Sequence, residues 1–358
     1  LAAGALHARG LVDWQQLAAR VERAARELRL AAGKQWAGTK LRWTEAAPEG
    51  IAEHLWQGAL DEMRDAFEQA AEGLDMVSEL SPDFVRLHER AVELARRSAR
   101  FAQPCASESV RWVDVGNQLR LVESPLDIAQ AVKSRMLKED SEDPEAQGRS
   151  WIFTSATLGD EPQLRWFTEP CGLEAAGVLR VSSPFDYPQQ AALYVPRNFP
   201  KPNDPAHSAQ VARLAGRGAA QLGGRTLVLT TTLRALRSIG DDLRRQFEQG
   251  DAAQALEVLV QGELPKRVLM ERFREGDAHG RPGCVLVASA SFWEGFDAPG
   301  EALQLVVIDK LPFPPPNDPL VEARSKRLES QGRSAFNDYF LPGAAIALKQ
   351  GGGRVVRR

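Results

Sequence analysis

The residues best suited to chemistry gather near the carboxyl end of the chain, where two arginines stand three positions apart. Gln350 is followed by Gly351-Gly352-Gly353 and then by Arg354 and Arg357. Residues three apart are neighbours on one face of a helix, and two forked guanidinium groups suit a phosphate chain. The glycines allow a sharp turn and a close approach of the backbone to a ligand. The pattern indicates a phosphate site, with a plain basic chain end as the alternative.

Two further stretches place polar residues directly after apolar runs. Thr154-Ser155-Ala156-Thr157-Leu158 follows residues 151–153, which we expect to form a short buried strand. Hydroxyl groups at a strand end can relay hydrogen bonds between a nucleotide and a neighbouring domain, although a helix N-cap explains them equally well. The second stretch, residues 291–300, follows the apolar run 284–288 and contains Trp293, Glu294, Gly295 and Asp297.

In this order, the three stretches resemble motifs III, V and VI of superfamily 2 helicases. The motif V stretch has the form typical of the DinG/YoaA branch of the XPD-like DNA helicases. Leu311-Pro312-Phe313-Pro314, followed by Asn317-Asp318-Pro319-Leu320, is typical of that branch as well. The resemblance covers residues 110–358 well and residues 1–110 by position only. The departures are small: Val355-Val356 replace bulkier aliphatic residues, and Gly352 occupies a variable position.

The resemblance implies a role for each matching residue. Arg354 and Arg357 would sense the phosphates, with Arg357 as the arginine finger and Gln350 placing both. The ATP-binding residues would be Gly353, Glu294, Gly295 and Asp297. The last three would also link the nucleotide cleft to the DNA path. Ser155 and Thr157 would couple hydrolysis to domain movement. DNA contacts are expected at Thr230, Thr231 and Thr232, at the position of motif IV, and at Trp293. A buried, loop-anchoring Trp293 is the alternative to stacking on a base.

The cofactors expected from the resemblance are ATP and Mg²⁺, bound jointly with a domain that this sequence lacks. A phosphate loop needs Gly-x-x-x-x-Gly-Lys-Ser/Thr, and the one nearby candidate, Gly33-Lys34, is followed by Gln35. No Asp-Glu-x-His motif is present to hold magnesium. An iron–sulfur cluster is expected only upstream. Because the chain begins at Leu1 and ends directly after motif VI, we expect it to be part of a longer protein.

The composition is that of an ordinary soluble protein, with 43% hydrophobic and 26% charged residues and a formal net charge of −3. That charge argues against a generally basic nucleic-acid binder but leaves room for a local basic groove. The three cysteines, Cys105, Cys171 and Cys284, are far apart, so no metal site is predicted. With no long apolar run or signal peptide, we expect a cytoplasmic monomer that avoids membranes.

The periodicity predicts an α/β fold: a RecA-like parallel sheet with helices on both faces, preceded by a mostly helical, arch-like subdomain. The expected domains are residues 1–108 (helical), 109–160 (the return into the first ATPase domain, with motif III) and 161–358 (a truncated second RecA-like domain). Asp13 and Ser81-Pro82 predict helix starts. A hairpin is expected around Gly116-Asn117. Residues 125–137 and a short stretch after Pro342 are expected to be helical.

We therefore expect part of an ATP-dependent DNA helicase, acting 5′ to 3′ on single-stranded or forked DNA in repair or replication stress. Alone, the chain should hydrolyse no ATP. One alternative is a catalytically inactive nucleic-acid-binding or scaffold protein that lacks the first motor domain. Another is a different P-loop enzyme, such as a relative fused to a nuclease.

Overall fold

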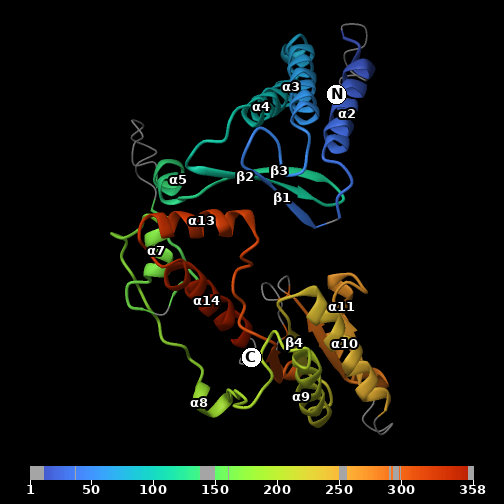
Figure 1. Cartoon of the computed structure of the whole chain (residues 1–358), viewed down its shortest axis with the longest axis vertical. Helices are drawn as coiled ribbons and strands as arrows, with labels where there is room; N and C mark the ends of the chain where they lie inside the picture. The colour runs from blue at the N-terminus through green and yellow to red at the C-terminus, as the bar shows by residue number, and fades with distance from the viewer. Residues whose placement is uncertain are drawn as a thin grey trace. The chain divides into compact units, whose positions relative to one another are not determined.

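The computed structural model describes residues 12–36, 38–137, 150–159, 161–249, 256–289, 292, 298 and 300–353. Contacts divide the chain into two compact units. Unit 1 comprises Leu1–Ala131 and Pro315–Gly332, and unit 2 comprises Val132–Pro314 and Arg333–Arg358. Figure 1 shows the elements of both units, coloured along the chain. The domain boundaries expected after residues 108 and 160 stay predictions.

Unit 1 combines helices with a three-stranded antiparallel sheet in the order β1-β2-β3. Its elements are α2 (Trp14–Ala31), β1 (Thr39–Trp43), α3 (Glu53–Asp75), a 3-10 turn (Ser78–Leu80), α4 (Pro82–Ala102), β2 (Ser109–Val115), β3 (Leu119–Pro125) and α13 (Pro319–Ser330). Two helix starts are confirmed. Asp13 accepts a hydrogen bond from the N–H of Gln16, and the Ser81 hydroxyl accepts one from the N–H of Asp83.

The strand β1 interrupts the region that we expected to be mostly helical. Its side chains alternate, with Leu41 and Trp43 buried and Lys40 and Arg42 more exposed. Trp43 packs against the ring of Trp56 on α3, with ring centroids 5.2 Å apart. A five-residue strand is stable here because its inner face completes the core beneath the helices and its edge pairs with β2.

Unit 2 alternates strands and helices around a parallel sheet in the order β5-β6-β4-β7. Its strands are β4 (Thr226–Leu229), β5 (Glu257–Val260), β6 (Cys284–Ala288) and β7 (Leu305–Ile308). Its helices are α7 (Arg165–Cys171), α8 (Tyr187–Gln190), α9 (His207–Gln221), α10 (Leu233–Glu248), α11 (Lys266–Glu275) and α14 (Leu341–Gly352), with 3-10 turns Ala278–Gly280 and Gly300–Ala302 and a π-helix Phe336–Phe340. The boundary after Ala131 falls within α5 (Ala129–Val132), which is followed in unit 2 by a second π-helix, Lys133–Leu137.

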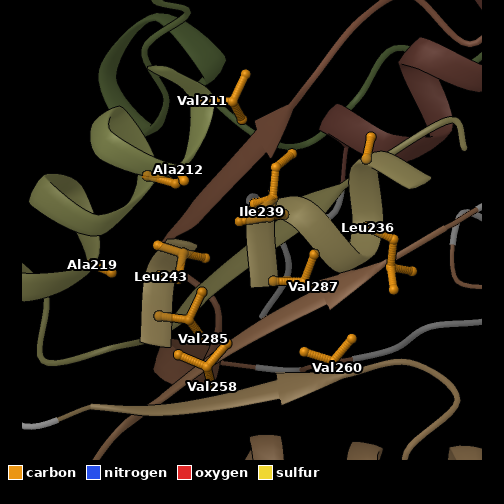
Figure 2. Close-up of a cluster of buried hydrophobic side chains, with 13 residues drawn as sticks. Val211, Ala212, Ala219, Leu236, Ile239, Leu243, Val258, Val260, Val285 and Val287 are labelled. Atoms are coloured by element: carbon orange, nitrogen blue, oxygen red, sulfur yellow. The ribbon is translucent and has the colours of Figure 1, made fainter. Parts of the chain in front are cut away.

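Both faces of the parallel sheet are covered, because successive side chains of a strand point to opposite faces. Val228 of β4 and Val285 and Val287 of β6 belong to a core that includes buried residues of α9 and α10, and Figure 2 shows this cluster. Leu227 and Leu286 belong to a second core, which includes residues of α11. The predicted α/β class is confirmed: a parallel sheet with helices on both faces and a mostly helical region before it.

Two local predictions are wrong or incomplete. Residues 151–153 form no strand: the segment is coil, and Ile152 is 86% exposed. An apolar run becomes a strand only beside a partner strand, and none of the described strands pairs with this segment. Residues 125–137, expected to be helical, begin as the end of β3 and then form α5 and the π-helix.

The hairpin at Gly116-Asn117 is confirmed by the pairing of Val115 with Leu119. None of the helices in the described ranges combines the length and apolar character needed to cross a membrane.

Candidate functional site

The carboxyl ends of β4, β6 and β7 meet at one edge of the unit 2 sheet, where ligands of parallel α/β sheets bind. Leu229 pairs with both Ala288 and Ile308, so the residues that follow these strands emerge side by side. They are Thr230 after β4, Ser289 after β6 and Asp309 after β7. The ladder continues beyond the strands, because Thr230 N–H donates to the Ala288 carbonyl at 2.8 Å and Asp309 N–H to the Leu229 carbonyl at 3.1 Å.

The three threonines after β4 have different environments. Thr230 is fully buried, and its hydroxyl lies 3.3 Å from the carbonyl oxygens of Thr232 and Ala288. Thr232 caps α10 by accepting from the N–H of Ala235 at 3.2 Å. Thr231 Oγ1 is buried without a hydrogen-bond partner among the described residues. Two of the three hydroxyls therefore have structural partners, whereas the Thr231 hydroxyl is buried without one among the described residues.

Asp309 is a buried carboxylate at this edge that our sequence analysis missed. It is 7% exposed, and its Oδ1 atom has no hydrogen-bond partner in the part of the chain described. Burial raises its pKa above the ordinary 3.8, although Lys310 and backbone N–H groups of Lys310 and Thr231 oppose that rise. Its signal in the sequence is a polar residue directly after an apolar run, the same arrangement as Thr230 after β4.

His207 ties the start of α9 to the end of β7. The residue is buried, and its Nδ1 and Nε2 atoms lie 2.8 Å and 2.9 Å from the carbonyl oxygens of Pro200 and Asp309. Asp309 is therefore fixed through its backbone on two sides, by β4 and by His207. These two contacts fix the backbone from which its side chain extends at the sheet edge.

The motif III and motif VI stretches meet within unit 2. Gln350 Nε2 donates to Thr157 Oγ1 at 3.2 Å, although the residues are 193 positions apart. Ser155 Oγ accepts from the N–H of Thr157 at 3.1 Å, and the two hydroxyl oxygens are 3.4 Å apart. Ser155 is exposed, while Thr157 and Gln350 are half-buried. One contact thus joins two of the three predicted motifs.

The glycines before the arginines do not turn the chain, contrary to our expectation. The helix α14 runs from Leu341 through Gly352, and Gly353 keeps a right-handed helical conformation with φ −66°. A glycine permits a turn but does not impose one. Here the helical hydrogen bonds continue, since Gly353 N–H donates to the Lys349 carbonyl at 3.0 Å. The helix after Pro342 is confirmed, and it is longer than predicted. Arg354 directly follows this rigid element.

The remaining predicted site residues, Trp293, Glu294, Gly295, Asp297, Arg354 and Arg357, lie outside the described residues. The side chains joined at this contact, Gln350, Thr157 and Ser155, carry neutral amide and hydroxyl groups. They fit the hydrogen-bonding needs of a phosphate or a coupling contact, but they offer no carboxylate for magnesium. Among the described residues, no three His, Cys, Asp or Glu side chains come together as a metal site would require.

Comparisons with known proteins agree with this arrangement. Residues 215–358 match the family described as helicase C-terminal domain. The chain is 41% identical to the ATP-dependent DNA helicase YoaA of Escherichia coli over 235 residues, which is 65% of this chain and 34% of YoaA. It is 34% identical to YoaA of Haemophilus influenzae over 303 residues, 82% of this chain and 44% of that protein. It is also 34% identical to the ATP-dependent helicase DinG of Mycobacterium tuberculosis over 211 residues, 58% of this chain and 30% of DinG. The chain therefore spans less than half the length of these relatives.

Proposed function

We propose that this chain, which is a C-terminal portion of the DinG/YoaA helicase type, supplies one part of an ATP-driven motor that separates DNA strands. The observation that carries the proposal is the Gln350–Thr157 hydrogen bond, because it joins the stretches that resemble motifs III and VI. A structural protein has no evident need to bring these two polar stretches together. In a motor, the same contact can transmit the state of the nucleotide.

The proposed roles follow from the positions of the residues. Arg354 and Arg357 follow α14 in the sequence. In this proposal, a shift of the helix would be passed on to both arginines. Gln350, one turn earlier, would report that shift to Thr157. Bound ATP with Mg²⁺ would supply the phosphoryl group for hydrolysis. The contribution of this chain would be to neutralise phosphate charge with Arg357 and to position it through Gln350.

The DNA substrate, the 5′ to 3′ direction and a role in repair or replication stress belong to the same proposal. They rest on the resemblance and on the relatives' printed names. The proposal also includes a monomer in the cytoplasm, and an iron–sulfur cluster in a region that the present sequence does not contain.

The test compares Arg357→Ala with Arg358→Ala in the full-length protein. Both changes remove one guanidinium from adjacent positions, but only Arg357 belongs to the Gln-x-x-Gly-Arg-x-x-Arg pattern. We expect Arg357→Ala to lower DNA-stimulated ATP hydrolysis by about 10³-fold or more, the range known for arginine fingers. Arg358→Ala should keep nearly normal activity. Equal activity of the two variants would overturn the assigned role.

A second experiment separates the motor from the inactive binding or scaffold protein. The 358-residue chain alone should release no phosphate from ATP with or without DNA, since its sequence has no phosphate loop. The full-length protein should hydrolyse ATP. If neither protein hydrolyses ATP, the scaffold alternative is correct.

A further inference from the structure

One helix of unit 1, α2, presents three arginines that have no ion-pair partner among the described residues. From Arg20 to Trp36, the sequence contains five cations and two carboxylates, although the whole chain has a net charge of −3. Arg23 and Arg26 are exposed and Arg29 is half-buried, and they lie opposite the buried face that contains Ala24 and Leu28. In the described part of the chain, no ion pair or side-chain hydrogen bond involves any of these three arginines.

The neighbouring cations on β1 behave differently. Lys40 pairs with Asp318 and Arg42 pairs with Glu322. Other cations of unit 1 therefore have ion-pair partners, whereas these arginines of α2 have none among the described residues. Residues three apart on a helix are neighbours, so Arg23, Arg26 and Arg29 form one continuous row. Clustered, unpaired cations on a chain of negative net charge indicate a surface for a polyanion.

An exposed aromatic ring stands at the end of this row. Trp36 is 88% exposed, more than any other aromatic side chain among the described residues. Its backbone is held, because the Trp36 carbonyl accepts from the N–H of Thr39 at 3.1 Å. The loop before it forms an open hollow of about 520 Å³, lined by Arg29, Leu30, Gly33, Lys34 and Gln35. Lys34 also has no ion-pair partner in the described part of the chain.

We propose that Arg23, Arg26, Arg29, Lys34 and Trp36, here named the α2 surface, bind single-stranded DNA. The inference rests on the proposed DNA substrate and assigns a contact to residues that the helicase motifs do not include. The cations would contact successive phosphates, and Trp36 would stack on a base above the hollow. Positive grooves combined with aromatic rings are how proteins bind single strands without sequence preference. Duplex DNA hides the faces of its bases, so the exposed ring favours a single strand.

The test measures the binding of fluorescein-labelled (dT)20 to the 358-residue chain by anisotropy at several salt concentrations. Arg26→Gln with Arg29→Gln should lower the magnitude of the slope of log K against log salt by about 1.4, because each neutralised phosphate contributes about 0.7. The matched control is Arg213→Gln with Arg217→Gln. These arginines are also exposed and unpaired in the described part of the chain, but they lie on α9 of unit 2. The control should leave the slope unchanged.

The second arm isolates the stacking contact. Trp36→Ala should weaken (dT)20 binding roughly 5- to 150-fold, as the loss of one base–aromatic stack does, and Trp36→Phe should restore most of it. Neither change should alter binding to a strand of equal length that lacks bases. Circular dichroism and thermal unfolding should be unchanged, since the ring is exposed.

Three outcomes would overturn the inference. If the wild-type chain binds (dT)20 and the α2 variants bind equally well, the inference fails while the proposed function stands. If the variants weaken duplex binding as much as single-strand binding, the surface binds polyanions in general. If the wild-type chain binds no DNA, the inference fails, and the ATP hydrolysis of the full-length protein then decides the proposed function separately.

Discussion

Lys40 and Asp318 are 278 positions apart in the chain, and Lys40 Nζ lies 2.5 Å from Asp318 Oδ2. Asp318 also caps α13, since its Oδ1 atom accepts from the N–H groups of Leu320 at 3.0 Å and Val321 at 3.3 Å. One carboxylate therefore starts the helix and joins it to β1. The cap uses Oδ1 and the ion pair uses Oδ2, so a substitution that keeps one oxygen can separate the two interactions.

Replacing Asp318 by Ala should destabilise unit 1 more than replacing it by Asn. Asn keeps an N-cap acceptor and loses only the ion pair, whereas Ala loses both. We expect a loss of about 1–2 kcal/mol for Asp318→Ala and at most about 1 kcal/mol for Asp318→Asn. Hydrogen exchange of the α13 amides in both variants measures the difference. Equal effects would show that the cap contributes nothing.

The pKa of Asp318 predicts how this contribution depends on pH. Burial by itself would raise the pKa, but the Lys40 ammonium and the N–H groups of Val321 and Leu320 outweigh it and leave the pKa lowered. A carboxyl group with a lowered folded-state pKa stabilises fully above its unfolded value and loses that effect as the pH falls through the folded one. The stability difference between wild type and Asp318→Asn should therefore hold at neutral pH and shrink below about pH 4.

Asp309 should show the opposite dependence on pH. Burial raises its pKa, so the ionised carboxylate is disfavoured in the folded chain. The wild type should lose stability relative to Asp309→Asn as the pH rises from about 4 through the raised folded value. This relative loss should be complete once the pH exceeds the raised folded value. Urea unfolding at a series of pH values measures this difference, and a difference that does not change with pH would contradict it.

Gly224 should tolerate no side chain, whereas its neighbour Gly223 should tolerate one at moderate cost. Both have positive φ, +95° and +62°. A Cβ atom on Gly224 would lie 2.5 Å from the backbone N of Cys284, while one on Gly223 would meet nothing within 4 Å. We expect Gly223→Ala to cost about 1–2 kcal/mol of conformational strain.

The variant Gly224→Ala adds an overlap with the backbone of β6 and should lower the free energy of unfolding by about 1–3 kcal/mol more. Urea unfolding of the two variants gives the comparison. Similar losses would mean that the backbone at Gly224 can move away from β6.

The sequence predicted the elements whose signals are local. Asp13 marks the start of α2, and Gly116-Asn117 marks the turn between β2 and β3. The strand β1 was missed, since its alternation of Lys40, Leu41, Arg42 and Trp43 is short and its partner β2 is distant in sequence. Residues 151–153 carry the same apolar signal as a strand, but pairing depends on a neighbour that local sequence does not reveal.

The candidate site was predicted in part for a similar reason. Residue types selected Thr157 and Gln350, and the fold places them in contact. Asp309 directly follows an apolar run, but the local sequence does not reveal its burial or its backbone contact with His207 at the start of α9. The helical conformation of Gly352 could not be predicted from residue type. An added Cβ there would meet nothing within 4 Å, so a glycine is not required by its surroundings.

Gln350 and Thr157 should be energetically coupled. Gln350→Ala and Thr157→Val each remove the hydrogen bond, and the double variant has no further bond to lose. A neutral hydrogen bond contributes about 0.5–1.5 kcal/mol. The sum of the losses in unfolding free energy of the two single variants should therefore exceed the loss in the double variant by about that amount. Urea unfolding of the 358-residue chain and its three variants measures the coupling energy.

In the full-length protein, the same cycle tests whether the contact serves the motor. If Gln350 reports the position of α14 to Thr157, each single variant should lower DNA-stimulated ATP hydrolysis about as much as the double variant does. Gln249→Ala is the control, because Gln249 is an exposed glutamine at the end of another helix, α10. It should leave both stability and hydrolysis close to wild type. Strictly additive effects on hydrolysis would mean that Gln350 and Thr157 act independently, and the contact would then have only a structural role.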